Sequence, residues 1–145
     1  MIALGSDHVA FDFKTSIAQY LTEAGYEIKD FGAFGFQRVD YFDFGIVVAE
    51  AVAQGKYEKG LVFCGTGVGM CISANKVKGV RAVVCSEPYS AKLSRQHNDT
   101  NVLALGARVV GIELAKMIID TWLTTPFEGG RHVARLQKIT QYERS

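Results

Sequence analysis

A cysteine followed by three alternating glycines is the strongest candidate for chemistry in the chain. Residues 64–69 read Cys-Gly-Thr-Gly-Val-Gly and continue an apolar run that starts at residue 60. Glycines where a strand gives way to a helix let successive backbone N–H groups converge on one point, which forms a binding site for an anion. A helix N-terminus also favours the thiolate form of a nearby cysteine, which is the reactive form. This run therefore predicts an anion-binding nest with Cys64 as a candidate catalytic group.

Other interpretations of residues 64–69 stay open when only the residues are considered. A glycine-rich turn often serves only to accommodate positive φ angles, and a free cysteine is more often a small core residue than a reagent. The spacing differs from the Gly-x-Gly-x-x-Gly fingerprint of dinucleotide-binding folds, and the run lies in the third strand–helix repeat instead of the first. Glu87 nevertheless follows at the distance expected of a ribose-binding acid. Dinucleotide binding is thus a weaker alternative.

Histidines, an aspartate and two arginines supply the other polar candidates. His97 lies at the end of a polar helical segment, where it could act on a ligand or cap the helix. Asp7 and His8 follow the first predicted strand, and Asp7 is also a candidate N-cap of the first helix. Arg131 and Arg135 are four residues apart, so they share one helix face. That face could clamp a phosphate or form a solvated basic surface.

Alternating apolar strands and helices must position these candidates. We expect strands at 1–6, 26–32, 60–64, 80–85 and 102–106. We expect helices at 10–24, 41–53, from the glycine run to 76, 87–97, 111–123 and 131–143. Five such repeats with short connections predict one domain, residues 1–145, of the α/β class: an open, doubly wound, Rossmann-like sheet of five parallel strands flanked by helices. In such sheets ligands bind beyond the carboxyl ends of the strands, which is where Asp7, Cys64 and Arg108 fall.

Composition excludes several classes of protein. With 145 residues, 48% hydrophobic and 21% charged, the chain can bury a core and is too apolar for intrinsic disorder. The net charge of +1 argues against bulk binding of nucleic acid, and no apolar run or leader pattern suggests a membrane segment. Cys64, Cys71 and Cys85 lack metal-ligand spacing, so we expect no structural zinc, no disulfide framework and a cytoplasmic setting. We assign Cys71 to packing and Cys85 to the core.

Together these motifs resemble the type B ribose-5-phosphate isomerases, a family that includes galactose-6-phosphate and allose-6-phosphate isomerases. The resemblance spans nearly the whole chain. It is carried by Asp7-His8, Asp40-Tyr41, residues 64–69, Ala74-Asn75-Lys76, Arg81-Ala82, residues 86–108 and residues 129–132. The long segment SEPYSAKLSRQHNDTN at 86–101 is the most specific of these matches.

The resemblance implies an aldose–ketose isomerase that works through an enediolate without a metal or cofactor. Cys64 matches the family's proton-abstracting base, Thr66 the hydroxyl that supports it, and His97 the residue that opens the furanose ring. The family's oxyanion nest corresponds to Gly65, Gly67, Val68 and Gly69. Its sugar- and phosphate-binding positions correspond to Asp7, His8, Tyr41, Asn98, Arg108, Arg131 and Arg135. The resemblance also implies a homodimer whose active sites take residues from both subunits, with further pairing into tetramers left open.

The expected substrates are ribose 5-phosphate and ribulose 5-phosphate, which are intermediates of the pentose phosphate pathway. A six-carbon 6-phosphate sugar, allose or galactose 6-phosphate, is the alternative within the same reaction class. A non-catalytic module that binds a phosphosugar or nucleotide is the alternative from another class, although such a module needs no thiol at the nest. Three positions depart from the family pattern: Ala10, Phe42 and Cys71. Because Phe42 adjoins Tyr41, the reaction type is better determined than the sugar.

Overall fold

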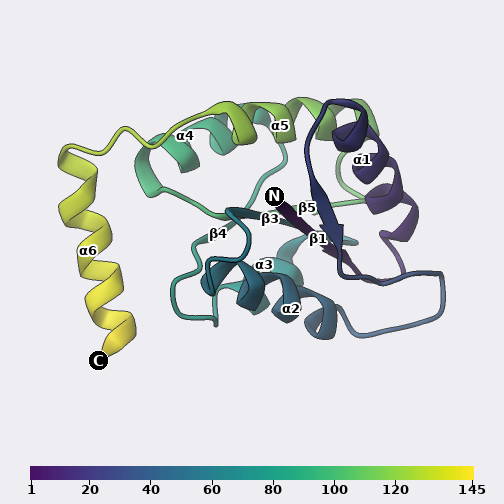
Figure 1. Ribbon diagram of the computed structural model, residues 1–145, viewed down its shortest axis with the longest axis horizontal. Helices are drawn as coiled ribbons and strands as arrows, with labels where there is room; N and C mark the ends of the chain where they lie inside the picture. The colour runs from purple at the N-terminus through teal and green to yellow at the C-terminus, as the bar shows by residue number, and fades with distance from the viewer.

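A five-stranded parallel sheet forms the centre of the computed structural model, which describes residues 1–145 (Figure 1). The strands are β1 (Ile2–Ser6), β2 (Ile28–Asp30), β3 (Lys59–Cys64), β4 (Ala82–Val84) and β5 (Val102–Gly106). They are ordered β2-β1-β3-β5-β4, and every neighbouring pair is parallel. The expected open, doubly wound α/β sheet is therefore confirmed. The order adds that β5 lies between β3 and β4.

Helices cover both faces of this sheet (Figure 1). The helices are α1 (Phe11–Glu23), α2 (Tyr41–Ala53), α3 (Val68–Ala74), α4 (Pro88–Asn98), α5 (Ile112–Thr124) and α6 (Arg131–Arg144). Helices α1, α4 and α5 lie on one face, and α2 and α3 lie on the other. None of the helices is long and apolar enough to cross a membrane.

The alternation of side chains along the central strands produces two separate cores. Leu61 and Phe63 of β3 pack into the cluster with α1 and α5. Val62 and Cys64 of the same strand pack into the cluster with α2 and α3. Because successive strand residues point to opposite faces, a continuous apolar strand feeds both cores at once. This alternation directs the Cys64 side chain towards α2 and α3.

The edge strands are shorter than the sequence indicates. β2 and β4 each have three residues, whereas the apolar patterns extend over 26–32 and 80–85. An edge strand has a partner on one side only, so fewer of its residues are held in the ladder. The central strand β5 and helix α2 begin and end at the residues that the sequence predicts.

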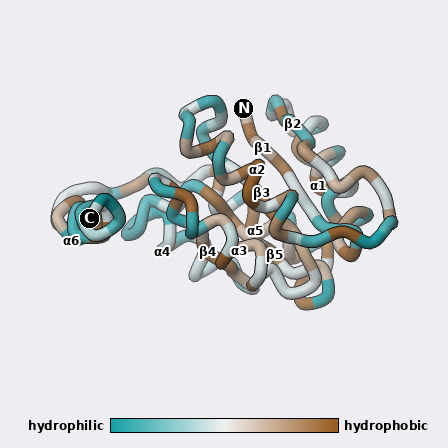
Figure 2. Tube along the Cα trace, turned by 90° about the horizontal axis from the view of Figure 1, so that it is seen from below, coloured by the Kyte–Doolittle hydropathy of each residue, from teal (hydrophilic) through white to brown (hydrophobic).

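Helix α6 stands apart from the other helices. Figure 2, seen from below, shows it at one end of the molecule, and Figure 1 shows it extending beyond α4. His132 is its only buried residue. Val133, Ile139 and Tyr142 expose large apolar surfaces. The position of α6 relative to the sheet therefore depends on few contacts within the chain.

Candidate active site

A cleft of about 440 Å³ opens at the carboxyl ends of β1, β3 and β5. It is lined by Asp7, Val9, Tyr41, Cys64, Gly65, Thr66, Val68, Gly69, Ile72 and Arg108. We call it the Cys64 cleft. It lies at the edge of the sheet where the doubly wound fold predicts a ligand. Val9 and Ile72 are the lining residues that sequence reasoning missed, and Ile72 could have been found one helical turn after Gly69.

Cys64 is the last residue of β3 and is 5% exposed. The backbone N–H of Gly67 donates a hydrogen bond to its sulfur over 3.1 Å. This contact fixes the position of the sulfur at the start of the glycine run. The sulfur thus has a built-in donor at the point where it meets the cleft.

The loop after Cys64 is held against the end of β5 by backbone contact. Gly67 has a φ of +82°, and a Cβ there would lie 2.9 Å from the carbonyl carbon of Leu105. A Cβ on Gly106 would lie 2.6 Å from the backbone of Thr66. Neither Gly67 nor Gly106 can therefore carry a side chain, and this close backbone contact fixes the loop relative to the sheet.

Thr66 makes a different contact from the one that the family resemblance implies. Its hydroxyl accepts a hydrogen bond from the N–H of Val68 over 3.2 Å and makes none with Cys64. A hydroxyl has one proton to donate in addition to its acceptor sites. Thr66 is thus left with a donor for a ligand in the cleft.

Tyr41 covers the glycine nest from the side of α2. A Cβ on Gly69 would lie 2.5 Å from Cε1 of the Tyr41 ring, so the ring reaches this position only because residue 69 is glycine. Tyr41 remains 45% exposed. The Tyr41 ring forms one wall of the cleft, and its position depends on the absence of a side chain at Gly69.

Asp7 and His8 follow β1 and are both oriented by backbone N–H groups. The Asp7 carboxylate accepts a hydrogen bond from the N–H of Ala10 over 3.1 Å. The N-cap of α1 is Ala10, so the N-cap alternative for Asp7 is wrong and its side chain instead holds the turn before the helix. His8 Nδ1 accepts from the N–H of Val39 over 3.1 Å. The neutral His8 ring then carries its proton on Nε2, where it can donate to a ligand.

Arg108 brings positive charge to the cleft. Its N–H donates to the carbonyl of Gly65 over 3.0 Å, which joins the segment after β5 to the loop after β3. Its side chain passes the same glycine, with Cδ 3.8 Å from the position of a Cβ there. A guanidinium beside converging N–H groups is suited to an anionic ligand.

Six sequence-predicted residues do not line the Cys64 cleft of the single chain. His8 and Gly67 are chain neighbours of lining residues, whereas the other four lie on α4 and α6. His97 and Asn98 end α4, and Arg131 and Arg135 belong to α6. None of the four lines the cleft. Asn98 instead lines a second cavity of about 420 Å³, which it shares with β4 and with Leu136 and Ile139 of α6. One chain therefore brings together the predicted base, the nest and Arg108, but not the predicted ring-opening group.

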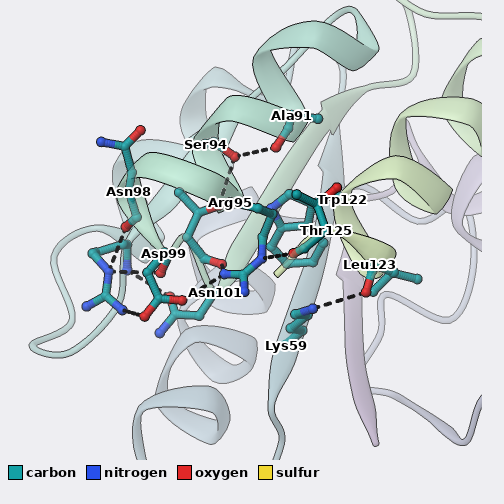
Figure 3. Close-up of polar contacts among 12 residues, drawn as sticks. Lys59, Ala91, Ser94, Arg95, Asn98, Asp99, Asn101, Trp122, Leu123 and Thr125 are labelled. Atoms are coloured by element: carbon teal, nitrogen blue, oxygen red, sulfur yellow. Dashed lines mark hydrogen bonds and ion pairs between the residues drawn. The ribbon is translucent and has the colours of Figure 1, made fainter. Parts of the chain in front are cut away.

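A buried arginine fixes the end of α4 (Figure 3). Arg95 is 8% exposed and donates to the carboxylate of Asp99 over 2.9 Å and to the carbonyl of Thr125 over 3.1 Å. Arg81 holds the other carboxylate oxygen of Asp99 over 3.2 Å. Asp99 has a φ of +46°, an uncommon conformation for a non-glycine residue, and these contacts retain it. They also fix the last turn of α4, which carries His97.

His97 packs against the first turn of α6. Its ring stacks on His132 with 4.4 Å between centroids and 18° between planes. Burial lowers the pKa of His132 below its ordinary value, and the charges of Arg131 and His97 lower it further. Glu128 Oε2 lies 3.7 Å from Nε2 of His132. We call His97, Glu128 and His132 the histidine cluster.

Comparisons with known proteins agree with this arrangement. The Ribose/Galactose Isomerase family matches residues 2–139. The chain is 58% identical over 142 residues to ribose-5-phosphate isomerase B of Escherichia coli (strain K12), covering 98% of this chain and 95% of that protein. It is 45% identical over 144 residues to D-erythrulose-4-phosphate isomerase of Pectobacterium atrosepticum, covering 98% and 94%. The solved structure of Clostridium thermocellum ribose-5-phosphate isomerase B superposes with a TM-score of 0.97 at 54% identity, covering 99% and 97%.

Proposed function

The chain belongs to the ribose/galactose isomerase family, and we propose that it interconverts ribose 5-phosphate and ribulose 5-phosphate. The observation that carries the proposal is Cys64, whose sulfur receives an N–H donor at a cleft that also contains Arg108. A six-carbon 6-phosphate sugar is the less favoured substrate, because the E. coli and C. thermocellum relatives are ribose-5-phosphate isomerases. A purely binding module is disfavoured for the same reason.

The reaction moves one proton between two carbons of the open-chain sugar. The Cys64 thiolate takes the proton from C2 of the aldose, the electron pair forms a C1–C2 double bond, and the aldehyde oxygen becomes the enediolate oxygen. The proton then returns to C1, and the hydroxyl proton on O2 moves to O1 as the C2 carbonyl forms. A positioned base contributes about 10²–10⁴-fold and an oxyanion donor about 10²–10³-fold.

The nest and Thr66 stabilise the negative charge that develops on the enediolate oxygen during this transfer. A thiolate is a modest base towards carbon, so stabilisation of the enediolate has to supply much of the barrier reduction. The backbone N–H groups of residues 65–69 do so without side-chain reorganisation, and the Thr66 hydroxyl adds a donor. Arg108 contributes positive charge on the same side.

We infer that the working enzyme is a homodimer in which each Cys64 cleft is completed by the other copy. His97 of the partner subunit would open the ring, and Arg131 and Arg135 of the partner subunit would hold the phosphate. Support comes from the absence of these residues from the cleft of one chain and from the apolar surface that α6 exposes. Val68 and Ile72 add exposed apolar surface at the rim of the cleft. Exposed apolar surface next to an incomplete site is typical of an interface.

The shared site can be tested by combining two variants with different defects, assayed at a substrate concentration below the wild-type KM. Cys64→Ala and the double variant Arg131→Ala, Arg135→Ala are co-expressed with different tags, and the mixed dimer is isolated. If sites are shared, one site of each mixed dimer carries both defects and the other carries none, so the isolated mixed dimer recovers about half of wild-type activity. If each site is built from one chain, every site keeps one defect and activity does not return.

The substrate is tested by following aldose–ketose conversion by NMR over five- and six-carbon sugar phosphates, with and without EDTA. We expect the highest kcat/KM with ribose 5-phosphate. A higher kcat/KM with allose 6-phosphate or galactose 6-phosphate would overturn the proposed substrate while leaving the reaction type intact. The free thiols of all three cysteines are compatible with a cytoplasmic enzyme of the pentose phosphate pathway, which is where we propose that it acts.

A further inference from the structure

Two imidazoles and a carboxylate from separate elements meet beside the end of α4. His97 belongs to the last turn of α4, Glu128 to the segment before α6, and His132 to the first turn of α6. One ligand atom from each residue lies within 4.8 Å of the other two. Imidazole nitrogen and carboxylate oxygen are the ligands that zinc and related divalent transition metals take in open sites.

One atom of the histidine cluster is buried without a partner. The His132 side chain is 5% exposed, and its Nε2 makes no hydrogen bond. The Glu128 oxygen at 3.7 Å is beyond hydrogen-bond distance. Unpartnered buried polar atoms are rare in folded proteins and call for an ion or water that satisfies them. The nearest carboxylate oxygen is that of Glu128, at 3.7 Å from Nε2.

The segment that carries Glu128 is tied to α4 by its backbone. The N–H of Glu128 donates to the carbonyl of Gln96 over 3.1 Å, one residue before His97. The Glu128 side chain is 45% exposed, so the cluster is open to solvent on that side. The backbone thus holds the carboxylate near both rings, and its side chain remains free to turn.

We propose that His97, Glu128 and His132 bind a divalent transition-metal ion of the zinc class, with water completing the coordination. Zinc takes nitrogen and oxygen ligands at about 2.0–2.2 Å, so the ligand atoms of a tetrahedral site lie about 3.4 Å apart. The pair formed by Glu128 and His132 is near that separation already. Coordination of one ion by all three side chains requires the stacked rings of His97 and His132 to tilt apart and the exposed Glu128 carboxylate to rotate. Arg131 and Arg135 oppose a cation, so the site is weaker than a closed structural zinc site.

An ion held here changes the chemistry available to His97. A metal-bound imidazole nitrogen has lost the lone pair that accepts a proton. Zinc would then block ring opening while leaving proton transfer at Cys64 intact. This consequence rests on the proposed function, whereas the ion site does not.

Binding is measured on the full-length protein after chelator treatment and dialysis. Zn²⁺ is titrated by calorimetry, and Co²⁺ is followed by its visible absorption. We expect one ion per chain, with affinity lowered at least about tenfold in Glu128→Gln and in His132→Gln. Glu128→Gln changes a half-exposed side chain and keeps the test valid if His132→Gln does not fold. Glu113→Gln, an exposed carboxylate on α5, and Cys71→Ala, a thiol, are the matched controls and should bind as wild type.

Activity supplies the second arm of the experiment. Zn²⁺ should inhibit turnover of ribose 5-phosphate in wild type and much less in Glu128→Gln. Exchange of the C1 protons of ribulose 5-phosphate with D₂O should persist in the presence of Zn²⁺, because the ketose has no furanose to open. Binding without inhibition supports the ion site and overturns the proposed effect on His97. Equal affinity in wild type and in both cluster variants, or loss of binding in Cys71→Ala, overturns the site itself.

Discussion

The Cys64 cleft and the histidine cluster are held in place in different ways. The cleft is built from backbone at the end of the sheet, where glycines at 67 and 106 allow two loops to touch. The cluster is built from side chains at the meeting of α4 and α6, and α6 contributes a single buried residue, His132. One chain therefore preorganises the groups that we assign to proton transfer. The group assigned to ring opening, His97, lies at the end of α4, and Arg131 and Arg135, assigned to phosphate binding, lie on α6, which buries little surface within one chain.

The largest effect should come from the sulfur of the cleft. Cys64→Ala is expected to lower kcat at least about 100-fold, the scale of one general base. The protein should still fold, because alanine occupies the same small site between β3 and α3. NMR measurement of ribose 5-phosphate turnover, with circular dichroism for folding, checks this. Cys71→Ala is the matched control, and equal losses in both variants would reduce Cys64 to a core residue.

Substitution of the arginines of α6 is expected to lower kcat less than Cys64→Ala does and to raise KM strongly. A charge-assisted hydrogen bond contributes about 1.5–3 kcal/mol, so Arg131→Ala or Arg135→Ala should each raise KM about 10–100-fold. The double variant should lose most of its preference for ribose 5-phosphate over ribose. It should also lose competitive inhibition by inorganic phosphate.

Steady-state kinetics with both sugars distinguishes this outcome from its opposite. If the double variant keeps its full preference for the phosphorylated sugar, Arg131 and Arg135 form a solvated helix face. Arg108 and His8 would then hold the phosphate without α6, and the contrast between the two regions would disappear.

Moving the wall of the cleft should have a moderate effect. Gly69→Ala places a Cβ 2.5 Å from the Tyr41 ring, which is half-exposed and can swing away. Overpacking of this kind costs about 1 kcal/mol and displaces the ring from the cleft. We therefore expect kcat/KM to fall about threefold to tenfold. Gly35→Ala is the control, since a Cβ there meets nothing within 4 Å. A wild-type kcat/KM in Gly69→Ala would show that Tyr41 does not shape the substrate site.

The smallest effect should come from the cysteine on the other face of the sheet. Burial raises the pKa of Cys85 to about 12, so its thiol stays protonated at pH 8. Iodoacetamide reacts with the thiolate, so Cys85 in the folded protein should be alkylated about a thousandfold more slowly than an exposed cysteine. Mass spectrometry of folded and denatured samples measures this. Cys85→Ala should retain wild-type activity, and rapid alkylation at pH 8 would contradict the buried, protonated thiol.

Much of the fold and half of the candidate site follow from local patterns. The sequence predicts the boundaries of β5 (Val102–Gly106) and α2 (Tyr41–Ala53) correctly, because a continuous apolar run and a helical period are strong local signals. The lengths of the edge strands β2 and β4 are predicted less well, because they depend on pairing with neighbouring strands. Asp7, Cys64 and Arg108 could be placed at one edge because parallel strands end on the same side of a sheet.

Residues that are neighbours along the chain carry the signals for the doubly wound sheet, the family and the Cys64 nest, so the amino-acid sequence is sufficient to predict all three. The folded structure adds that a set of predicted site residues lies outside the cleft of one chain, namely His97, Asn98, Arg131 and Arg135. It also brings His97 of α4 against Glu128 and His132. Contacts between α4 and α6 join segments that β5 and α5 separate along the chain, and short-range sequence patterns carry no information about which distant segments pack together.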